Sequence, residues 1–122
     1  MHSQANTVII IEDEPDAADA LATIVRDWGA EVAIGSDPQA IAEQLGARIR
    51  DVGWIITDFH LGPGPDGVKM VQEIANAAPA AKVLVLSGSF RERASEEAAK
   101  AGYEVMHKPA RAEKIVSWLE RA

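Results

Sequence analysis

Five polar residues follow apolar segments of this chain, at positions where their side chains could meet. They are Glu12, Asp13, Asp58, Ser87 and Lys108. Carboxylates with a hydroxyl and an ammonium can hold a hard cation and a phosphoryl group, because Mg²⁺ prefers oxygen ligands and phosphoryl transfer needs its charged oxygens neutralised. Each residue alone would be ordinary loop polarity. The combination predicts a site for phosphoryl transfer.

The residue types assign different roles within this set. Asp58 stands alone at the end of an apolar segment, so it is the best candidate for a nucleophile that forms an aspartyl phosphate. Glu12 and Asp13 would then hold the cation. Lys108 could pair with one phosphoryl oxygen, and the Ser87 hydroxyl could donate a hydrogen bond to another.

Short apolar runs rich in β-branched residues must position these side chains. Such runs are typical of strands that are covered on both faces of a parallel sheet. The clear runs are residues 8–11, 54–56 and 83–86, and the weaker ones are residues 32–34 and 103–106.

Helical patterns separate the expected strands. The first helix begins at Pro15 and ends before Gly29, two residue types that favour those helix ends. A second helix follows the N-cap Asp37, with Ile41, Leu45 and Ile49 along one stripe. Three more are expected: one capped by Asp66 that stops before Pro79, an alanine-rich one over residues 91–101, and one over about residues 112–121.

Five strand–helix units in alternation predict one α/β domain over residues 1–122. Right-handed crossovers place the carboxyl ends of all the strands at one edge of the sheet, where ligands of such sheets bind. The five polar residues should therefore share that edge.

Composition limits the classes of function. The chain has 122 residues and 48% hydrophobic content, enough for one core, and its formal charge of −7 argues against direct binding to nucleic acid. It has no cysteine, which excludes disulfides and thiolate metal sites. The sequence shows neither a signal-peptide pattern nor an apolar run of membrane-spanning length, so we expect a cytoplasmic protein without membrane insertion.

Four segments together resemble the receiver domains of response regulators and of hybrid sensor histidine kinases, and the resemblance covers essentially the whole chain. The segments are Ile11-Glu12-Asp13-Glu14-Pro15, Thr57-Asp58-Phe59-His60-Leu61, Ser87-Gly88 and Lys108-Pro109. The resemblance implies a flavodoxin-like fold, a five-stranded parallel sheet in the order 2-1-3-4-5 with helices on both faces. It implies that Asp58 receives a phosphoryl group from a phosphohistidine of a sensor histidine kinase or a histidine phosphotransfer protein. Such a domain is not an enzyme beyond its own phosphorylation and dephosphorylation.

The resemblance also implies details of the site. Mg²⁺ or Mn²⁺ would touch Asp13, Asp58 and the backbone carbonyl of His60. Gly88 would let the phosphoryl group approach, and the peptide bond before Pro109 would be cis. Phosphorylation would draw the loop after the fourth strand towards the site and switch a partner-binding surface on the fourth helix, fifth strand and fifth helix. The same surface is a candidate for homodimerisation, and the output partner is unknown.

The chain departs from the family pattern at three positions. Glu12 stands where Asp is commoner, so its longer side chain is expected to reach the cation through water. Ser87 replaces the commoner Thr and keeps the hydroxyl. Val105 occupies the position of a switch aromatic, and the nearby Tyr103 is interpreted as a packing residue.

Two alternatives stay open at this stage. A receiver-like interaction module that is not phosphorylated would fit the departures at Glu12 and Val105. A phosphatase of the haloacid dehalogenase type would use similar residues, but it expects its nucleophile after the first strand and usually a cap domain.

Overall fold

The computed structural model describes residues 6–12, 14–58, 66–87, 98–108 and 110–121, without the side chains of residues 58, 66–70 and 87. No helix in these ranges is both long and apolar enough to cross a membrane.

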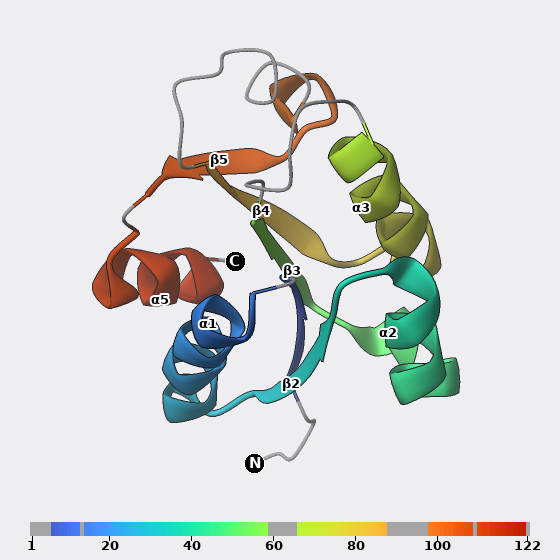
Figure 1. Ribbon diagram of the computed structural model, residues 1–122, viewed down its shortest axis with the longest axis horizontal. Coiled ribbons are helices and arrows are strands. Elements are labelled where there is room, and N and C mark those ends of the chain that lie inside the picture. The colour runs from blue at the N-terminus through green and yellow to red at the C-terminus, as the bar shows by residue number, and fades with distance from the viewer. Residues whose placement is uncertain (1–5, 13, 59–65, 88–97, 109, 122) are drawn as a thin grey trace.

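A parallel sheet of five strands forms the centre of the molecule (Figure 1). The order β2-β1-β3-β4-β5 confirms the predicted 2-1-3-4-5 topology. Its strands are β1 (Thr7–Ile11), β2 (Glu31–Gly35), β3 (Trp54–Asp58), β4 (Lys82–Ser87) and β5 (Glu104–His107). Every pair of neighbouring strands is parallel, so all the carboxyl ends lie at one edge.

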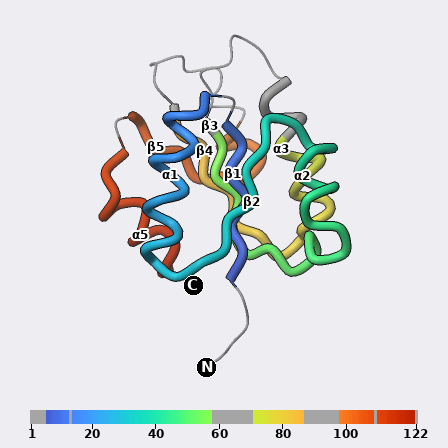
Figure 2. The backbone as a smooth tube through the Cα atoms, turned by 60° about the horizontal axis from the view of Figure 1, so that its bottom comes forward, coloured from blue at the N-terminus to red at the C-terminus, as the bar shows by residue number. Residues whose placement is uncertain are grey.

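Helices cover both faces of the sheet, as predicted. The helical elements are α1 (Pro15–Trp28), α2 (Pro38–Leu45), the 3₁₀ helix η1 (Gly46–Asp51), α3 (Asp66–Ala77) and α5 (Ala112–Glu120). Helices α1 and α5 lie on one face, and α2 and α3 lie on the other (Figures 1 and 2). Most of the helix expected over residues 91–101 falls outside the described residues, although Ala98 near its end is buried against the α3 face.

The ends of α1 follow from its sequence. Pro15 is in the first turn, where its missing N–H costs nothing. Gly29 closes the helix in the left-handed conformation, with φ of 112°, and its amide donates to the carbonyl oxygens of Val25 and Arg26. A side chain with a Cβ would be strained there.

The second helix is shorter than its apolar stripe suggests. Asp37 caps α2 as predicted, because its Oδ1 accepts the amide of Ala40 at 2.8 Å. The α-helix ends at Leu45, and the chain continues as the 3₁₀ helix η1 from Gly46, whose φ is 55°. Ile49 therefore packs against the core from η1 and not from α2.

Hydrogen bonds and an ion pair connect the end of α5 to the sheet. The ammonium of Lys82, at the start of β4, donates to the carbonyl oxygens of Trp118 and Arg121 and lies 5.4 Å from the centre of the Trp118 ring. A cation near the last carbonyls of a helix is favourable. The Arg121 guanidinium also bonds Glu104 of β5 at 2.7 Å. These contacts lie at the edge opposite the predicted site.

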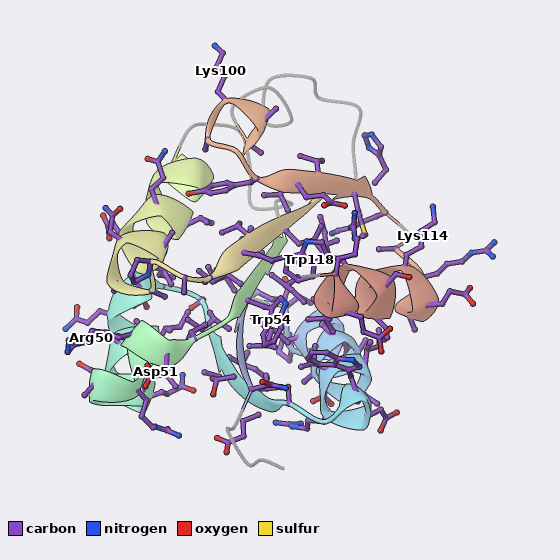
Figure 3. The ribbon with its side chains drawn as sticks, turned by 180° about the vertical axis from the view of Figure 1, so that it is seen from behind. Arg50, Asp51, Trp54, Lys100, Lys114 and Trp118 are labelled. Atoms are coloured by element: carbon purple, nitrogen blue, oxygen red, sulfur yellow. The ribbon has the colours of Figure 1, made fainter. Side chains whose placement is uncertain are left out.

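Trp118 is the largest fully buried side chain, and it lies between α5 and the sheet (Figure 3). We expect Trp118→Ala to lower the free energy of unfolding by about 3–5 kcal/mol, because it removes a ring from the core and leaves a cavity. Urea denaturation followed by far-UV circular dichroism would measure this loss. The neighbouring Ser117 is exposed, so Ser117→Ala should change stability by less than about 0.5 kcal/mol. Equal losses in the two variants would contradict the assigned packing.

Candidate functional site

Strand register aligns the positions of three predicted site residues. Asp58, the last residue of β3, pairs with Leu86 of β4, the residue before Ser87. Ser87 in turn pairs with His107 of β5, the residue before Lys108. Neighbouring strands are about 4.8 Å apart, and Lys108 lies two residues beyond the level of Asp58, so its backbone is roughly 12 Å from that of Asp58. The flexible four-carbon side chain of a lysine can cover part of this distance. Lys108 is half-buried.

Glu12 joins the same edge from β1. Ile11 pairs with Thr57, so Glu12 and Asp58 each directly follow a paired residue on neighbouring strands. The Glu12 amide donates to the Gly35 carbonyl at 3.1 Å, which extends the ladder with β2 past the end of β1. The structure therefore brings together the positions of Glu12, Asp58, Ser87 and Lys108, as the sequence predicts.

The Glu12 side chain is buried, with only 4% of the residue exposed. Its Oε2 accepts a hydrogen bond of 3.0 Å from the backbone amide of Glu14. Glu14 is the N-cap residue of α1, and its own side chain makes no capping bond. This contact ties the acidic segment to the start of the helix. We did not predict it, although a carboxylate two residues before an N-cap could have suggested it.

The predicted cation ligands are only partly within the described residues. Asp13, the His60 carbonyl and the Asp58 carboxylate lie outside them, and so do Gly88 and the peptide bond before Pro109. Among the described residues, no group of three or more His, Cys, Asp or Glu could hold a metal ion. The donor types still suit a hard cation, because they are all oxygens and the buried Glu12 carboxylate stands at this edge.

Two residues near the predicted switch position pack into the core. Val105 in β5 and Tyr103 just before it are half-buried against the hydrophobic cluster on the α3 face. Burial raises the pKa of the Tyr103 hydroxyl above its ordinary value of 10.0 by desolvation of the charged form. Both observations agree with the interpretation of Tyr103 as a packing residue.

Known proteins resemble the chain along almost its entire length. Residues 8–120 match the family described as response regulator receiver domain. The nitrogen assimilation regulatory protein NtrX of Azorhizobium caulinodans is 29% identical over 97% of this chain and 26% of its own length. A response regulator receiver protein of an Anaeromyxobacter species is 33% identical over 88% of this chain and 44% of its own length. This chain thus spans well under two thirds of these relatives.

A solved structure supports the same comparison. A response regulator protein from Burkholderia pseudomallei, crystallised with a phosphorylated aspartic acid, a calcium ion and citrate, superposes with a TM-score of 0.77. The two sequences are 26% identical, and the match covers 94% of this chain and 66% of the other.

Tyr103 is the chain's single tyrosine, so its titration can be followed directly by ultraviolet absorbance. We expect its midpoint in the folded protein to lie above 10.0, because burial disfavours the phenolate. The folded state then binds this proton more tightly than the unfolded state. This difference stabilises the folded protein fully at pH values below the pKa of Tyr103 in the unfolded chain. The stabilisation is lost as the pH rises through the higher pKa of Tyr103 in the folded protein. A midpoint at or below the value for the denatured chain would contradict the packing of Tyr103.

Proposed function

Because this chain belongs to the response regulator receiver domain family, we propose that Asp58 is its phosphoacceptor residue. One observation supports the proposal: by strand register, the backbone positions of Glu12, Asp58, Ser87 and Lys108 fall at the carboxyl ends of four neighbouring strands. Ligands of open α/β sheets bind at this edge.

The proposed reaction is transfer from the phosphohistidine of a sensor histidine kinase or a histidine phosphotransfer protein. A carboxylate oxygen of Asp58 forms the new bond to phosphorus, the bond from phosphorus to the donor's ring nitrogen breaks, and its electron pair stays on that nitrogen. The Lys108 ammonium neutralises a phosphoryl oxygen, and the Ser87 hydroxyl donates a hydrogen bond to another. The chain acts on its own Asp58 only, in phosphorylation and in the later hydrolysis.

Receiver domains bind a divalent metal ion at the phosphorylation site, and we assign Mg²⁺ or Mn²⁺ to this one. Asp13, Asp58 and the His60 carbonyl would hold the ion, with Glu12 beside them. Their oxygen donors match the preference of these ions, and the bound ion would neutralise charge on the phosphoryl oxygens. The Burkholderia protein, whose crystal structure contains a phosphorylated aspartic acid and a calcium ion, supports this assignment.

Phosphorylation would switch the partner-binding surface on the fourth helix, β5 and α5. A hydrogen bond from Ser87 to the phosphoryl group exists only in the phosphorylated state, so it can bias the conformation of the loop that follows. Ser87 is paired with β5, which passes the change towards α5. We propose that this surface binds an output partner or a second copy of the chain.

Phosphorylation of Asp58 can be tested with acetyl phosphate and Mg²⁺. We expect the intact mass of the wild-type chain to rise by one phosphoryl group, and Asp58→Asn to abolish the rise because an amide is not a nucleophile here. Removal of the metal ion with a chelator should prevent the reaction.

A matched variant controls for the loss of charge. Asp51 is exposed at the end of η1, away from the carboxyl edge (Figure 3), so Asp51→Asn should gain the phosphoryl group normally. A wild-type chain that stays unmodified would instead indicate a receiver-like interaction module. Continued turnover of small phosphate esters, beyond one group per chain, would indicate a phosphatase.

The switch can be tested separately from the chemistry with Ser87→Ala. We expect this variant to accept the phosphoryl group but to lose most of the phosphorylation-dependent change in the amide resonances of β5 and α5, since its hydroxyl supplies the bias. Nuclear magnetic resonance spectra recorded before and after phosphorylation would measure the change. Ser117→Ala, on the exposed face of α5, should respond as the wild type does. A full response in Ser87→Ala would refute the coupling.

A further inference from the structure

An open groove lies between α1 and α5, which pack side by side on one face of the sheet (Figures 1 and 2). Its volume is about 380 Å³, and most of its lining is apolar. The lining residues are Ile24, Asp27, Trp28, Ala112 and Val116. Ile24, Trp28 and Val116 are half-buried, so each leaves part of an apolar side chain exposed to solvent.

Helix α1 has more apolar surface than the sheet covers. Four of its apolar residues are buried: Ala18, Leu21, Ala22 and Val25. A second stripe of partly or fully exposed residues recurs at spacings of three or four positions: Ala17, Ala20, Ile24 and Trp28. Because Ile24 and Trp28 line the groove, this second stripe forms its α1 wall.

Trp28 is held in a fixed orientation at one end of the groove. Its ring packs in a T-shaped arrangement against that of Trp54 in β3, with ring centres 5.2 Å apart. Its Nε1 donates a hydrogen bond of 3.3 Å to Oε2 of Glu120 in α5. A side chain that is already ordered loses little entropy on binding, and tryptophan is enriched among the residues that contribute most to interfaces. Trp28 is therefore suited to contact an apolar side chain of a partner.

The charged residues beside the groove are acidic. Asp27 lines it, and Glu113 and Glu120 are the helical neighbours of Val116 at i−3 and i+4. All three are exposed. The groove thus has an apolar floor and an acidic rim.

The basic residues within these two helices lie on other sides. Arg26 of α1 and Lys114 of α5 are each two positions from both apolar groove residues of their own helix. Residues two positions apart do not share a helix face. Figure 3 shows Lys114 on the side of α5 away from α1. The acidic rim is therefore not neutralised from within either helix.

We propose that the α1–α5 groove binds an amphipathic helix of a partner protein, with apolar side chains between α1 and α5 and lysine or arginine side chains beside the rim. An open groove cannot enclose a small molecule, whereas a helix can lie along it. A second copy of this chain is a poor occupant, because its formal charge of −7 would add to the acidic rim. The opposite charges of a basic helix would instead speed association and fix its orientation.

The Trp28 end of the groove lies away from the proposed phosphorylation site. Helix α1 begins near the carboxyl edge of the sheet and ends at Trp28, three residues before β2 starts at the opposite edge. A helix anchored at Trp28 leaves Asp58 accessible to the phosphoryl donor. The inference goes beyond the proposed function and does not depend on it.

Synthetic peptides test the apolar floor and the acidic rim separately. The probe is a helical peptide of about 16 residues, with leucines along one face and lysines beside them. One control peptide has glutamates in place of the lysines, and the other has alanines in place of the leucines. We expect each control to bind the wild-type chain at least about tenfold more weakly than the probe. These changes lie in the peptide, so the fold of the chain is untouched.

The measurement is a titration of the unphosphorylated, ¹⁵N-labelled full chain with each peptide. It gives the dissociation constant and locates the bound peptide. The indole Nε1–H resonance of Trp28 and the amide resonances of Ile24 and Val116 should shift. Asp58→Asn should bind the probe as the wild type does, because Asp58 is not part of the groove.

Charge reversal on the chain provides a matched pair of variants. Asp27→Lys combined with Glu113→Lys should weaken binding of the probe about tenfold or more, because both residues lie at the rim. Glu43→Lys combined with Asp51→Lys makes the same change in net charge at exposed positions of α2 and η1, on the other face of the sheet. This second variant should stay within about threefold of the wild-type affinity.

Several results would overturn the inference. They are equal binding of the three peptides, shifts confined to another face, and equal affinities in the two charge-reversed variants. Failure of the probe to bind the wild-type chain would also overturn it, even if Asp58 is phosphorylated normally. Concentration-dependent shifts of the groove resonances without peptide would show that a second copy occupies the groove instead. Binding of the probe to a chain that cannot be phosphorylated would refute the proposed function alone.

Discussion

The register of the parallel strands is the constraint on which the site depends. The neighbouring strands β1, β3, β4 and β5 each have one polar site residue at their carboxyl end or directly after it. The paired residues Ile11–Thr57, Asp58–Leu86 and Ser87–His107 show that these ends lie at similar levels across the sheet. A shift of one residue in any pair would send a strand's side chains to the opposite face. Such a shift would move the residues of that strand from one hydrophobic cluster into the other and disturb the packing of both, so the two cores favour the observed geometry of the edge.

Packing on the two faces is continuous through β1 and β3, and this explains why the register is well defined. Alternate residues of these strands enter the α1–α5 cluster and the α2–α3 cluster, and residues 8–11 of β1 are all fully buried. Hydrophobic side chains on both faces leave no polar surface in the strand interiors. Within the five strands, charged residues therefore stand only at the strand ends, and the chemistry is proposed at the carboxyl ends.

The strands and most helix ends could be predicted because local residues determine them: Pro15 and Gly29 bound α1, and Asp37 caps α2. The end of α2 could not, since Ile49 satisfies the same apolar spacing from a 3₁₀ turn as it would from an α-helix. The sequence also predicted that the positions of Glu12, Asp58, Ser87 and Lys108 lie at the carboxyl edge of the sheet. A carboxylate two residues before an N-cap allows the contact of Glu12 with the Glu14 amide but does not determine it, because the contact also depends on how α1 follows β1.

Contacts at the edge opposite the site limit how a conformational change that starts at Asp58 would spread. At the edge opposite the site, Lys82 of β4 holds the last carbonyls of α5, and Arg121 bonds Glu104 at the start of β5. The part-buried contact of the Lys82 ammonium with the Trp118 carbonyl is the costlier one to break, whereas the exposed Arg121–Glu104 ion pair contributes little. A displacement that starts at Ser87 therefore meets least resistance at the carboxyl ends of β4 and β5. With Val105 packed in place of an aromatic ring, the response would pass through the backbone pairing of Ser87 with His107 and reach α5 at its first turn, near Ala112.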